Sequence, residues 1–281
     1  MNYRHAFHAG GFADVVKHAI LALLLTHLRQ KETPFCVLDT HAGAGCYDLA
    51  ADAAQRTGEA QDGIHRLIDG GVAQLPALEP FVAGLRTANA AWPRLRIYPG
   101  SPLIARSMLR SHDRLIAVEL HPEEARALKR LFAHDRQVAV HEADGYAALK
   151  SHLPPKERRG LVLIDPPFEQ MDEFRRMTRA LPDALHRFRN GIFALWYPIK
   201  AAGPVEQFRA EIAGLGRPAL AAEVYRFRPD DPMRLNGTGL IVVNPPWKLD
   251  ETLESLLPIL AQRLGARGET RVVQLSRAGT A

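Results

Sequence analysis

Cysteine and long hydrophobic runs are both scarce in this 281-residue sequence. Two cysteines, Cys36 and Cys46, provide no disulfide framework and fit a reducing compartment, for which we expect the cytoplasm. The longest apolar run, residues 19–25, falls well short of the roughly 20 residues that a membrane-spanning helix needs. Because charged residues precede this run, it does not fit a signal peptide. We therefore expect no membrane association.

Lysine is also rare. The 36 basic residues comprise 7 Lys and 29 Arg, against 31 acidic residues, which gives a net charge of +5. Arginine binds phosphates and base edges well, so this composition permits a nucleic-acid partner without requiring one. Apolar residues make up 47% of the chain and charged residues 24%, which excludes a mainly disordered or coiled-coil protein.

Short apolar segments alternate with helical patterns along the chain. Helical patterns include residues 13–29, 122–132 and 172–188. Seven segments have the composition of buried strands, at residues 35–39, 115–119, 138–144, 160–165, 191–196, 223–228 and 239–244. This alternation predicts an α/β fold with a seven-stranded, mostly parallel sheet that binds its ligands at the carboxyl ends of the strands.

The interval between the first two strands is too long for a single connection. From Asp39 to Glu119 the chain advances 80 residues, whereas a strand–helix–strand unit needs about 30. A helix beginning at Ser101 supplies the crossover. We therefore predict a small helical insertion at residues 48–96. The predicted core comprises residues 1–47 and 97–281, with residues 1–30 as an N-terminal arm and helix.

The motif Asp165-Pro166-Pro167-Phe168 follows the clearest of the predicted strands. An exocyclic amine such as adenine N6 is a poor nucleophile, because its lone pair is delocalised into the ring. The Asp165 carboxylate and the Pro166 carbonyl can accept its two N–H groups, and Asp165 can take the departing proton. Phe168 offers a face on which an extruded base can stack. A simple strand-ending turn is the alternative, but the position after a buried strand favours an amino-methyltransferase.

A second motif, Asn244-Pro245-Pro246-Trp247, also follows an apolar strand and could perform the same chemistry. The order of the strands separates the two motifs. Asp165 ends the fourth strand, whereas Asn244 ends the seventh, far from the expected cofactor site. We therefore predict a structural role for the second motif, such as positioning the wall of the target pocket.

A glycine-rich turn from Asp39 to Gly45 follows the first strand. Gly43 allows close approach of the backbone to a ligand. Residue 48 is Asp where the dinucleotide fingerprint has Gly, which argues against a nicotinamide oxidoreductase. S-adenosylmethionine has no phosphate, so an acid near this turn is tolerable and can receive the cofactor's ammonium. At the next strand ends, Glu119 is placed for ribose hydroxyls. Asp144 and Gly145 are placed for the adenine ring.

Basic and aromatic residues gather at the N-terminus. An ordered arm beside the active site would bring Lys17 or His18 to the cofactor carboxylate, and Tyr3 or His5 to RNA. A frayed basic start to the first helix is the alternative. We predict no metal site, because Asp14 is the one carboxylate that joins these histidines at ligand spacing.

Taken together, these motifs resemble the RlmJ family of 23S ribosomal RNA adenine-N6 methyltransferases over essentially the whole chain. The residues that carry the resemblance are Tyr3-Arg4-His5-Ala6-Phe7-His8-Ala9-Gly10, the turn from Leu38 to Gly45, Tyr98 to Arg106, Asp165-Pro166-Pro167, Ala194 to Pro198, and Asn244 to Lys248. The resemblance implies a monomeric, Rossmann-like class I enzyme that uses S-adenosylmethionine to methylate an adenine of 23S rRNA.

The resemblance also implies roles for individual residues. It makes Asp165 the catalytic acceptor and Tyr3 a contact for substrate RNA, with His5 and Lys17 in the same arm. The implied cofactor contacts are His18, His41, Ser101, Glu119, Asp144 and Gly145. Two alternatives remain open at this point: a DNA adenine-N6 methyltransferase, and a non-catalytic RNA-binding protein on a methyltransferase fold.

Overall fold

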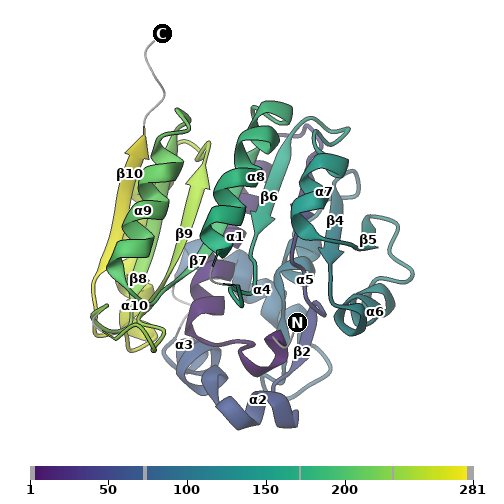
Figure 1. Ribbon diagram of the computed structural model, residues 1–281. Helices are drawn as coiled ribbons and strands as arrows, with labels where there is room; N and C mark the ends of the chain where they lie inside the picture. Colours follow the sequence, from purple (N-terminus) through teal and green to yellow (C-terminus); the bar gives the residue numbers. More distant parts are fainter. Residues whose placement is uncertain (1–3, 72–74, 171, 230, 277–281) are drawn as a thin grey trace.

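One mixed sheet forms the centre of the molecule. The computed structural model describes residues 4–71, 75–170, 172–229 and 231–276. The strands are ordered β10-β8-β9-β7-β6-β1-β4-β5 (Figure 1). They comprise β1 (Cys36–Asp39), β4 (Arg114–Glu119), β5 (Val138–Glu142), β6 (Gly160–Ile164), β7 (Ile192–Ile199), β8 (Ala219–Tyr225), β9 (Gly237–Val243) and β10 (Thr270–Ser276). The pairs from β5 to β7 are parallel, whereas β9 and β10 run antiparallel to their neighbours.

The predicted α/β class and mostly parallel sheet are confirmed, but the sheet has eight strands where we predicted seven. Strand β10 lies at the sheet edge and consists of half-buried and exposed residues, so it contains no long apolar run to detect. The strand predicted at residues 223–228 runs instead over Ala219–Tyr225. The prediction missed its start because the first half consists of buried alanine and leucine, which have no strong strand signature. Residues 226–228 therefore belong to the following loop.

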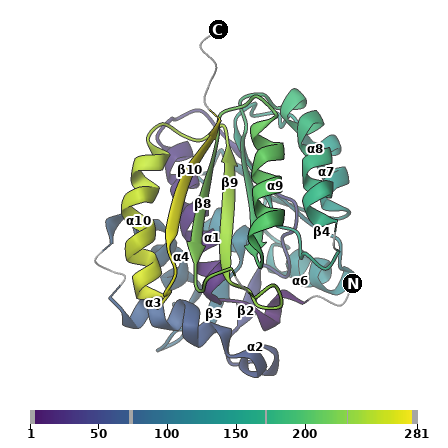
Figure 2. The same ribbon diagram turned by 60° about the vertical axis from the view of Figure 1, so that its left-hand side comes forward.

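Helices cover both faces of the sheet, as Figures 1 and 2 show. On one face lie α1 (Phe12–Arg29), α5 (Ser101–Ser107), α6 (Pro122–Leu131) and α10 (Leu249–Arg263). On the other face lie α7 (Gly145–His152), α8 (Glu173–Arg187) and α9 (Ala202–Ala213). The result is a three-layer sandwich with two buried clusters, one on each side of the sheet. No helix among the described residues is long and apolar enough to cross a membrane.

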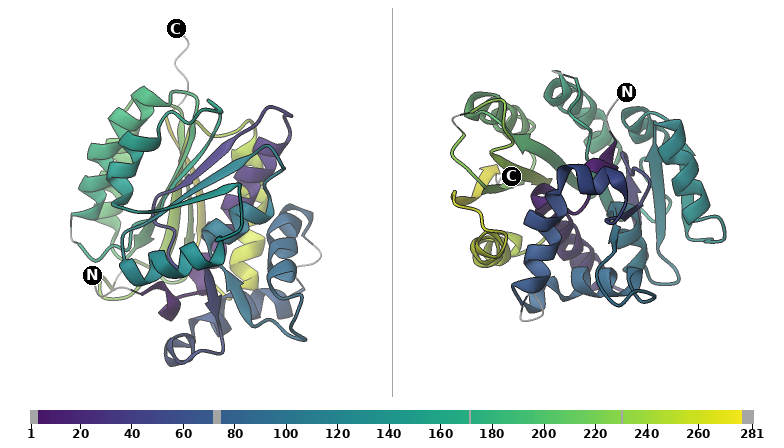
Figure 3. Two further views of the ribbon diagram at one scale, coloured as in Figure 1. Left: turned by 90° about the vertical axis from the view of Figure 1, so that its right-hand side faces the viewer. Right: turned by 90° about the horizontal axis from the view of Figure 1, so that it is seen from below.

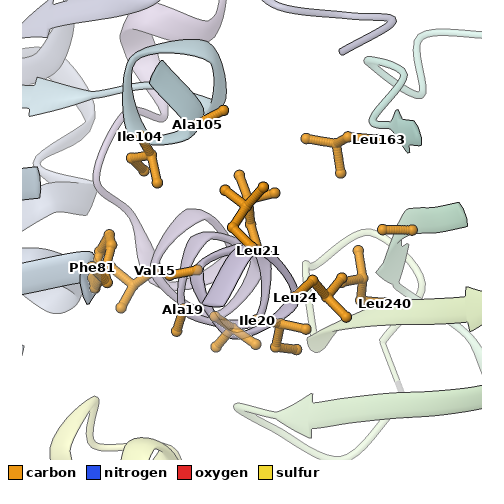
Figure 4. Packing of buried hydrophobic residues seen from close by; sticks show 14 of the residues in the cluster. Val15, Ala19, Ile20, Leu21, Leu24, Phe81, Ile104, Ala105, Leu163 and Leu240 are labelled. Carbon is orange, nitrogen blue, oxygen red and sulfur yellow. The ribbon is translucent and has the colours of Figure 1, made fainter. Parts of the chain in front are cut away.

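Helix α1 is enclosed on almost every side. Its apolar residues point in several directions, toward Phe81 and Ile104 on one side and Leu240 of β9 on the other (Figure 4). Ile20 and Leu24 are fully buried. A helix with apolar residues all round must be buried rather than lie on a surface, so its sequence accounts for its central position.

The segment between β1 and β4 makes a helical excursion at one end of the molecule (Figure 3). A two-stranded antiparallel ribbon joins its ends, with β2 (Cys46–Asp48) paired to β3 (Ile97–Pro99). Asp48 at the end of β2 also binds Arg96, with 2.7 Å between the closest atoms. The described helical elements between these strands are α2 (Asp52–Thr57), η2 (Gln61–His65), α3 (Arg66–Asp69), η4 (Pro76–Leu78) and α4 (Glu79–Ala88). The buried apolar residues of η2, α3, η4 and α4 belong to the same cluster as α1, so this part of the excursion packs against the core. The domain boundaries at 48 and 96 stay a prediction.

Asn244 lies at the opposite edge of the sheet from the carboxyl ends of the parallel strands. Strand β9 runs antiparallel to β7, so Val243 pairs with Phe193 near the start of β7. The Asn244 side chain donates to the backbone carbonyls of Arg189 and Gly191, at 3.0 and 2.8 Å. Its function is therefore to close the loop before β7. The predicted structural role fits this geometry, but the motif does not reach the wall of a pocket at the other edge.

The central position of α1 predicts a large cost for truncating its apolar side chains. Leu24→Ala should lower the free energy of unfolding by about 2–5 kcal/mol, because the surrounding layers cannot collapse into the cavity. Chemical denaturation measures this change. The control is Ile259→Ala in α10, whose side chain is 38% exposed and should cost about 1 kcal/mol or less. Equal costs at both positions would contradict the central role of α1.

Candidate active site

The carboxyl ends of three parallel strands bring the predicted acids to one edge of the sheet. Asp39 ends β1, Glu119 ends β4 and Asp165 follows β6, and β1 lies between the other two strands. The connections from β1 to β4 and from β4 to β5 pass over the face that α5 and α6 cover. The connections from β5 to β6 and from β6 to β7 pass over the opposite face, which α7 and α8 cover. Such a switch point leaves a crevice at the strand ends, where α/β sheets bind their ligands.

Glu119 organises the glycine-rich turn. Its two carboxylate oxygens accept the backbone N–H groups of Gly43, at 2.8 Å, and of His121, at 2.6 Å. Gly43 has a φ of +59°, and a Cβ there would lie 2.2 Å from the Tyr47 hydroxyl, so any other residue would be strained and would displace Tyr47. Two of the predicted cofactor contacts, Gly43 and Glu119, are thus in direct contact with each other. Burial raises the pKa of Glu119.

Asp39 is a buried carboxyl group with an open hydrogen-bonding position. It is 1% exposed, and within the described chain its Oδ2 atom has no hydrogen-bond partner. Burial raises the pKa of Asp39 to about 7, although interaction with the Ser101 side chain offsets part of this effect. An unpaired buried acceptor costs about 1–3 kcal/mol, so this atom is suited to a donor from a ligand. Ser101, another predicted contact, thus lies beside it.

His18 carries a second open position. Its Nδ1 lies 2.8 Å from the hydroxyl of Tyr98, while Nε2 lacks a partner among the described residues. Burial lowers the pKa of His18 well below its usual range, so the ring is neutral. His41, also predicted as a contact, is neutral too, since burial lowers its pKa to about 4. Its Nδ1 lies 2.8 Å from the Thr40 hydroxyl.

A series of ionisable side chains in contact links the N-terminal arm to Asp165. His5, in the short helix η1 (His5–Phe7), lies with Nε2 2.8 Å from Oδ2 of Asp14. Asp14 Oδ1 lies 2.9 Å from Lys17 Nζ, and Nζ lies 2.5 Å from Asp165 Oδ2. The Lys17 side chain is 4% exposed and that of Asp165 is 11% exposed. Lys17 therefore contacts Asp165 directly, a juxtaposition that the sequence motifs did not indicate.

The charges around Asp14 and Lys17 favour the ionised form of both side chains. Burial alone would lower the pKa of Lys17, but the charges of Asp14 and Asp165 raise it above the usual range. Burial alone would likewise raise the pKa of Asp14, but His5 and Lys17 hold it well below its usual range. The three-residue spacing of Asp14 and Lys17 on one helix was the available sequence signal for this pair.

Aromatic residues line the motif that follows β6. Phe168 has a φ of +51°, which is unusual for a residue with a side chain. Its ring meets Phe174 and Trp196 edge to face, at centroid distances of 5.0 and 5.7 Å. Lys17 Nζ lies 5.5 Å from the Trp196 ring. Trp196 is thus a site residue to which the sequence analysis assigned no role.

Asp144 caps helix α7 in addition to standing at a strand end. Its Oδ1 accepts the backbone N–H groups of Tyr146 and Ala147, both at 2.9 Å, and Oδ2 lies 3.4 Å from Arg176. At Gly145 an added Cβ would lie 2.3 Å from the Thr40 carbonyl oxygen, so close packing requires glycine there. Asp144 and Gly145 therefore stand at the start of α7, where the Gly145 backbone packs against the Thr40 carbonyl.

Tyr3 was predicted to contact RNA, and no metal site was predicted. Tyr3 lies outside the described residues. Among the described residues, no group of three or more His, Cys, Asp or Glu side chains is placed to hold a metal ion.

Comparison with known proteins identifies the family. The sequence profile described as "Ribosomal RNA large subunit methyltransferase D, RlmJ" matches residues 32–275. Ribosomal RNA large subunit methyltransferase J of Escherichia coli K12 is 41% identical over 270 residues, which cover 95% of each chain. The protein of the same name from Haemophilus influenzae is 39% identical over the same share of both chains.

A solved structure agrees with the fold. The crystal structure of a protein from Legionella pneumophila str. Philadelphia 1 is 32% identical and superposes with a TM-score of 0.87. The match covers 95% of this chain and 98% of that one. The resemblance noted from the sequence motifs is confirmed, and the chain belongs to the RlmJ family of ribosomal RNA large subunit methyltransferases.

Proposed function

We propose that this protein transfers a methyl group from S-adenosylmethionine to N6 of an adenine in 23S rRNA. The observation that carries the proposal is the Asp165 carboxylate, which Lys17 holds at the end of β6 beside an aromatic wall. The names of the two curated relatives, both large-subunit ribosomal RNA methyltransferases, support the class of substrate. We further propose that the protein acts as a monomer in the cytoplasm.

The open polar atoms of the site suit the two ends of an amino acid. Asp39 Oδ2 is a buried acceptor able to receive an ammonium group, and His18 Nε2 is able to donate to a carboxylate once Tyr98 donates to Nδ1. Glu119, with Gly43 close beside it, would meet the ribose. His41, Ser101, Asp144 and Gly145 would complete the contacts to the nucleoside. These residues fit S-adenosylmethionine, which supplies an electrophilic methyl group on its sulfonium centre.

Asp165 and Pro166 would prepare the attacking amine. Lys17 engages Asp165 Oδ2, so Oδ1 is the oxygen available to accept one N–H of adenine N6. The Pro166 carbonyl would accept the other N–H, which localises the lone pair on N6 toward the methyl group. As the N–C bond forms and the S–C bond breaks, N6 loses a proton that Asp165 can take. Phe168 and Trp196 would stack on the extruded base.

Removing the charge of Asp165 should stop methyl transfer. We expect Asp165→Asn and Asp165→Ala to lower kcat on unmodified 23S rRNA by about 10²–10⁴-fold, because the proton acceptor is lost. Transfer of a radiolabelled methyl group measures kcat. The control is Asp183→Asn, an exposed acid on α8 that should leave kcat unchanged. Full activity of Asp165→Ala would sink the catalytic assignment.

The choice of RNA over DNA rests on the relatives, because the local chemistry of the site suits either adenine. We expect methyl incorporation into deproteinised, unmodified 23S rRNA and little into duplex DNA of equal adenine content. Mass-spectrometric mapping should then find N6-methyladenosine missing from the 23S rRNA of a deletion strain. A preference for DNA would overturn the RNA assignment. Failure to bind S-adenosylmethionine with retained RNA binding would instead indicate a non-catalytic protein.

Ionisation of Asp39 should control affinity for S-adenosylmethionine. Its raised pKa means that the carboxyl group is protonated below about pH 7 and ionised above it. An ammonium ligand prefers the ionised form, so affinity should fall about five- to tenfold from about pH 7.5 to about pH 6. Calorimetry measures this affinity, and Asp39→Asn should bind weakly without the pH dependence.

Stability gives an independent measure of the same carboxyl group. The folded protein holds the Asp39 proton up to about pH 7, whereas the unfolded chain releases it near the ordinary aspartate pKa of 3.8. The contribution of Asp39 to stability should therefore decline as pH rises from about 4 to about 7. Asp39→Asn should remove this decline. A pH-independent affinity in the wild type would contradict the proposed role of Asp39.

A further inference from the structure

The loop between β8 and β9 emerges at the same edge of the sheet as Asp165. Its described residues are 226–229 and 231–236, which we call the β8–β9 loop. Ile164 is level with Leu195 of β7, so Asp165 is level with Trp196. The loop begins and ends where Gly237 pairs with Ile199, three residues further along β7. Three residues of strand span roughly 10 Å, so the loop stands just beyond the aromatic wall of the site.

A buried asparagine anchors the base of this loop. Asn236 is fully buried, and its side-chain amide donates to the carbonyls of Lys200 and Asp231, both at 2.7 Å. The backbone carbonyl of Asn236 accepts the backbone N–H groups of Arg226 and Phe227, at 2.7 and 2.9 Å. These bonds hold both ends of the loop to the end of β7. The outer residues of the loop are therefore carried on a base that hydrogen bonds fix to the sheet.

The outer surface of the loop combines arginine, an aromatic ring and exposed apolar groups. The Arg234 guanidinium lies 4.1 Å from the centroid of the Phe227 ring. Arg228 is exposed, and Met233 is 90% exposed. Planar guanidinium groups stack on bases and bind phosphates bidentately, and thioether and aromatic groups pack on base faces. These are the chemical properties of a surface for single-stranded RNA.

Two arginines of the loop are exposed in positions that suit contact with phosphate. Between Tyr225 and Gly237 the sequence carries Arg226, Arg228 and Arg234 against Asp230 and Asp231, a net charge of +1. Arg226 bridges to Asp62 of the insertion at 2.6 Å, and Asp231 accepts the backbone N–H of Met233. Arg228 and Arg234 are both exposed at the outer surface, where an RNA backbone could approach.

We propose that the β8–β9 loop binds the 23S rRNA nucleotides that flank the target adenine. The proposal rests on the function proposed above and extends it, since it assigns a second contact surface to the same substrate. Roughly 10 Å corresponds to about three stacked nucleotides at 3.4 Å each, so the loop would hold neighbours of the extruded base. Arg228 contacts phosphate and Met233 packs on a base.

Kinetics with two variants test this surface. We expect Arg228→Ala and Met233→Ser each to raise KM for unmodified 23S rRNA about five- to tenfold, with kcat within about twofold of wild type. Arg228→Ala should also make the slope of log affinity against log salt shallower by about 0.7–1, since one phosphate contact is lost. Filter binding of the same RNA measures this slope. Affinity for S-adenosylmethionine should not change.

The matched control is Arg187→Ala, an exposed arginine at the end of α8, near the opposite edge of the sheet. It should leave KM and the salt slope at wild-type values. If both loop variants behave as Arg187→Ala does, the loop does not bind RNA, while wild-type methylation still supports the proposed function. Met233 is almost fully exposed, so Met233→Ser keeps the fold intact as a readout.

Two other results have defined meanings. If the wild type methylates no 23S rRNA, the proposed function fails, and filter binding alone then decides whether the loop contributes to RNA affinity. If the wild type sediments as a dimer and Met233→Ser as a monomer with unchanged KM, the surface joins two copies of the chain. That result would overturn the RNA proposal.

Discussion

The site depends on the ion pairs that the ammonium group of Lys17 makes with two carboxylates inside the protein. A buried charge is stable only when it is fully paired, and removal of one partner of such a pair typically costs about 3–5 kcal/mol. Lys17 contacts Asp14 on its own helix and Asp165 after β6. The position of the Asp165 motif therefore depends on α1, whose Lys17 lies 148 residues earlier in the sequence.

The same ion pair makes the N-terminal arm part of the site. Asp14 binds His5 through its side chain and accepts the backbone N–H of Gly10 at 3.1 Å. The arm is thereby held against the start of α1, and α1 is enclosed between the sheet and the insertion. The insertion supports the site indirectly, since its buried residues cover the helix that delivers the charge. Substrate chemistry and core packing thus share one element.

Much of the fold could be predicted from the sequence because its signals are local. The apolar run before Asp165 and the alternation of strands and helices identify the parallel sheet, and the strand-end position of Asp39, Glu119 and Asp165 follows directly. Strand β10 was missed because an edge strand need bury only part of its surface. The beginning of β8 was missed because alanine, although fully buried there, has little strand propensity.

The contacts within the site were less predictable, because they join distant parts of the chain. Lys17 and Asp165 are 148 residues apart, and neither neighbourhood indicates the other. Trp196 lies inside a strand whose pattern suggests only core packing, although its ring forms part of the wall beside Phe168. The motif at Asn244 resembles that at Asp165 in sequence, and only the antiparallel direction of β9 removes it from the site.

The ribbon of β2 and β3 joins the two ends of the insertion beside the cofactor contacts. The Gly100 N–H donates to the Gly45 carbonyl at 2.9 Å, so the glycine turn and the start of α5 are tied together where the excursion leaves and returns. Gly43 and Ser101 consequently keep their mutual positions through contacts at the two ends of the excursion. Changes confined to the exposed residues of this segment should therefore leave both contacts in place, whereas its buried residues are constrained by their packing against α1.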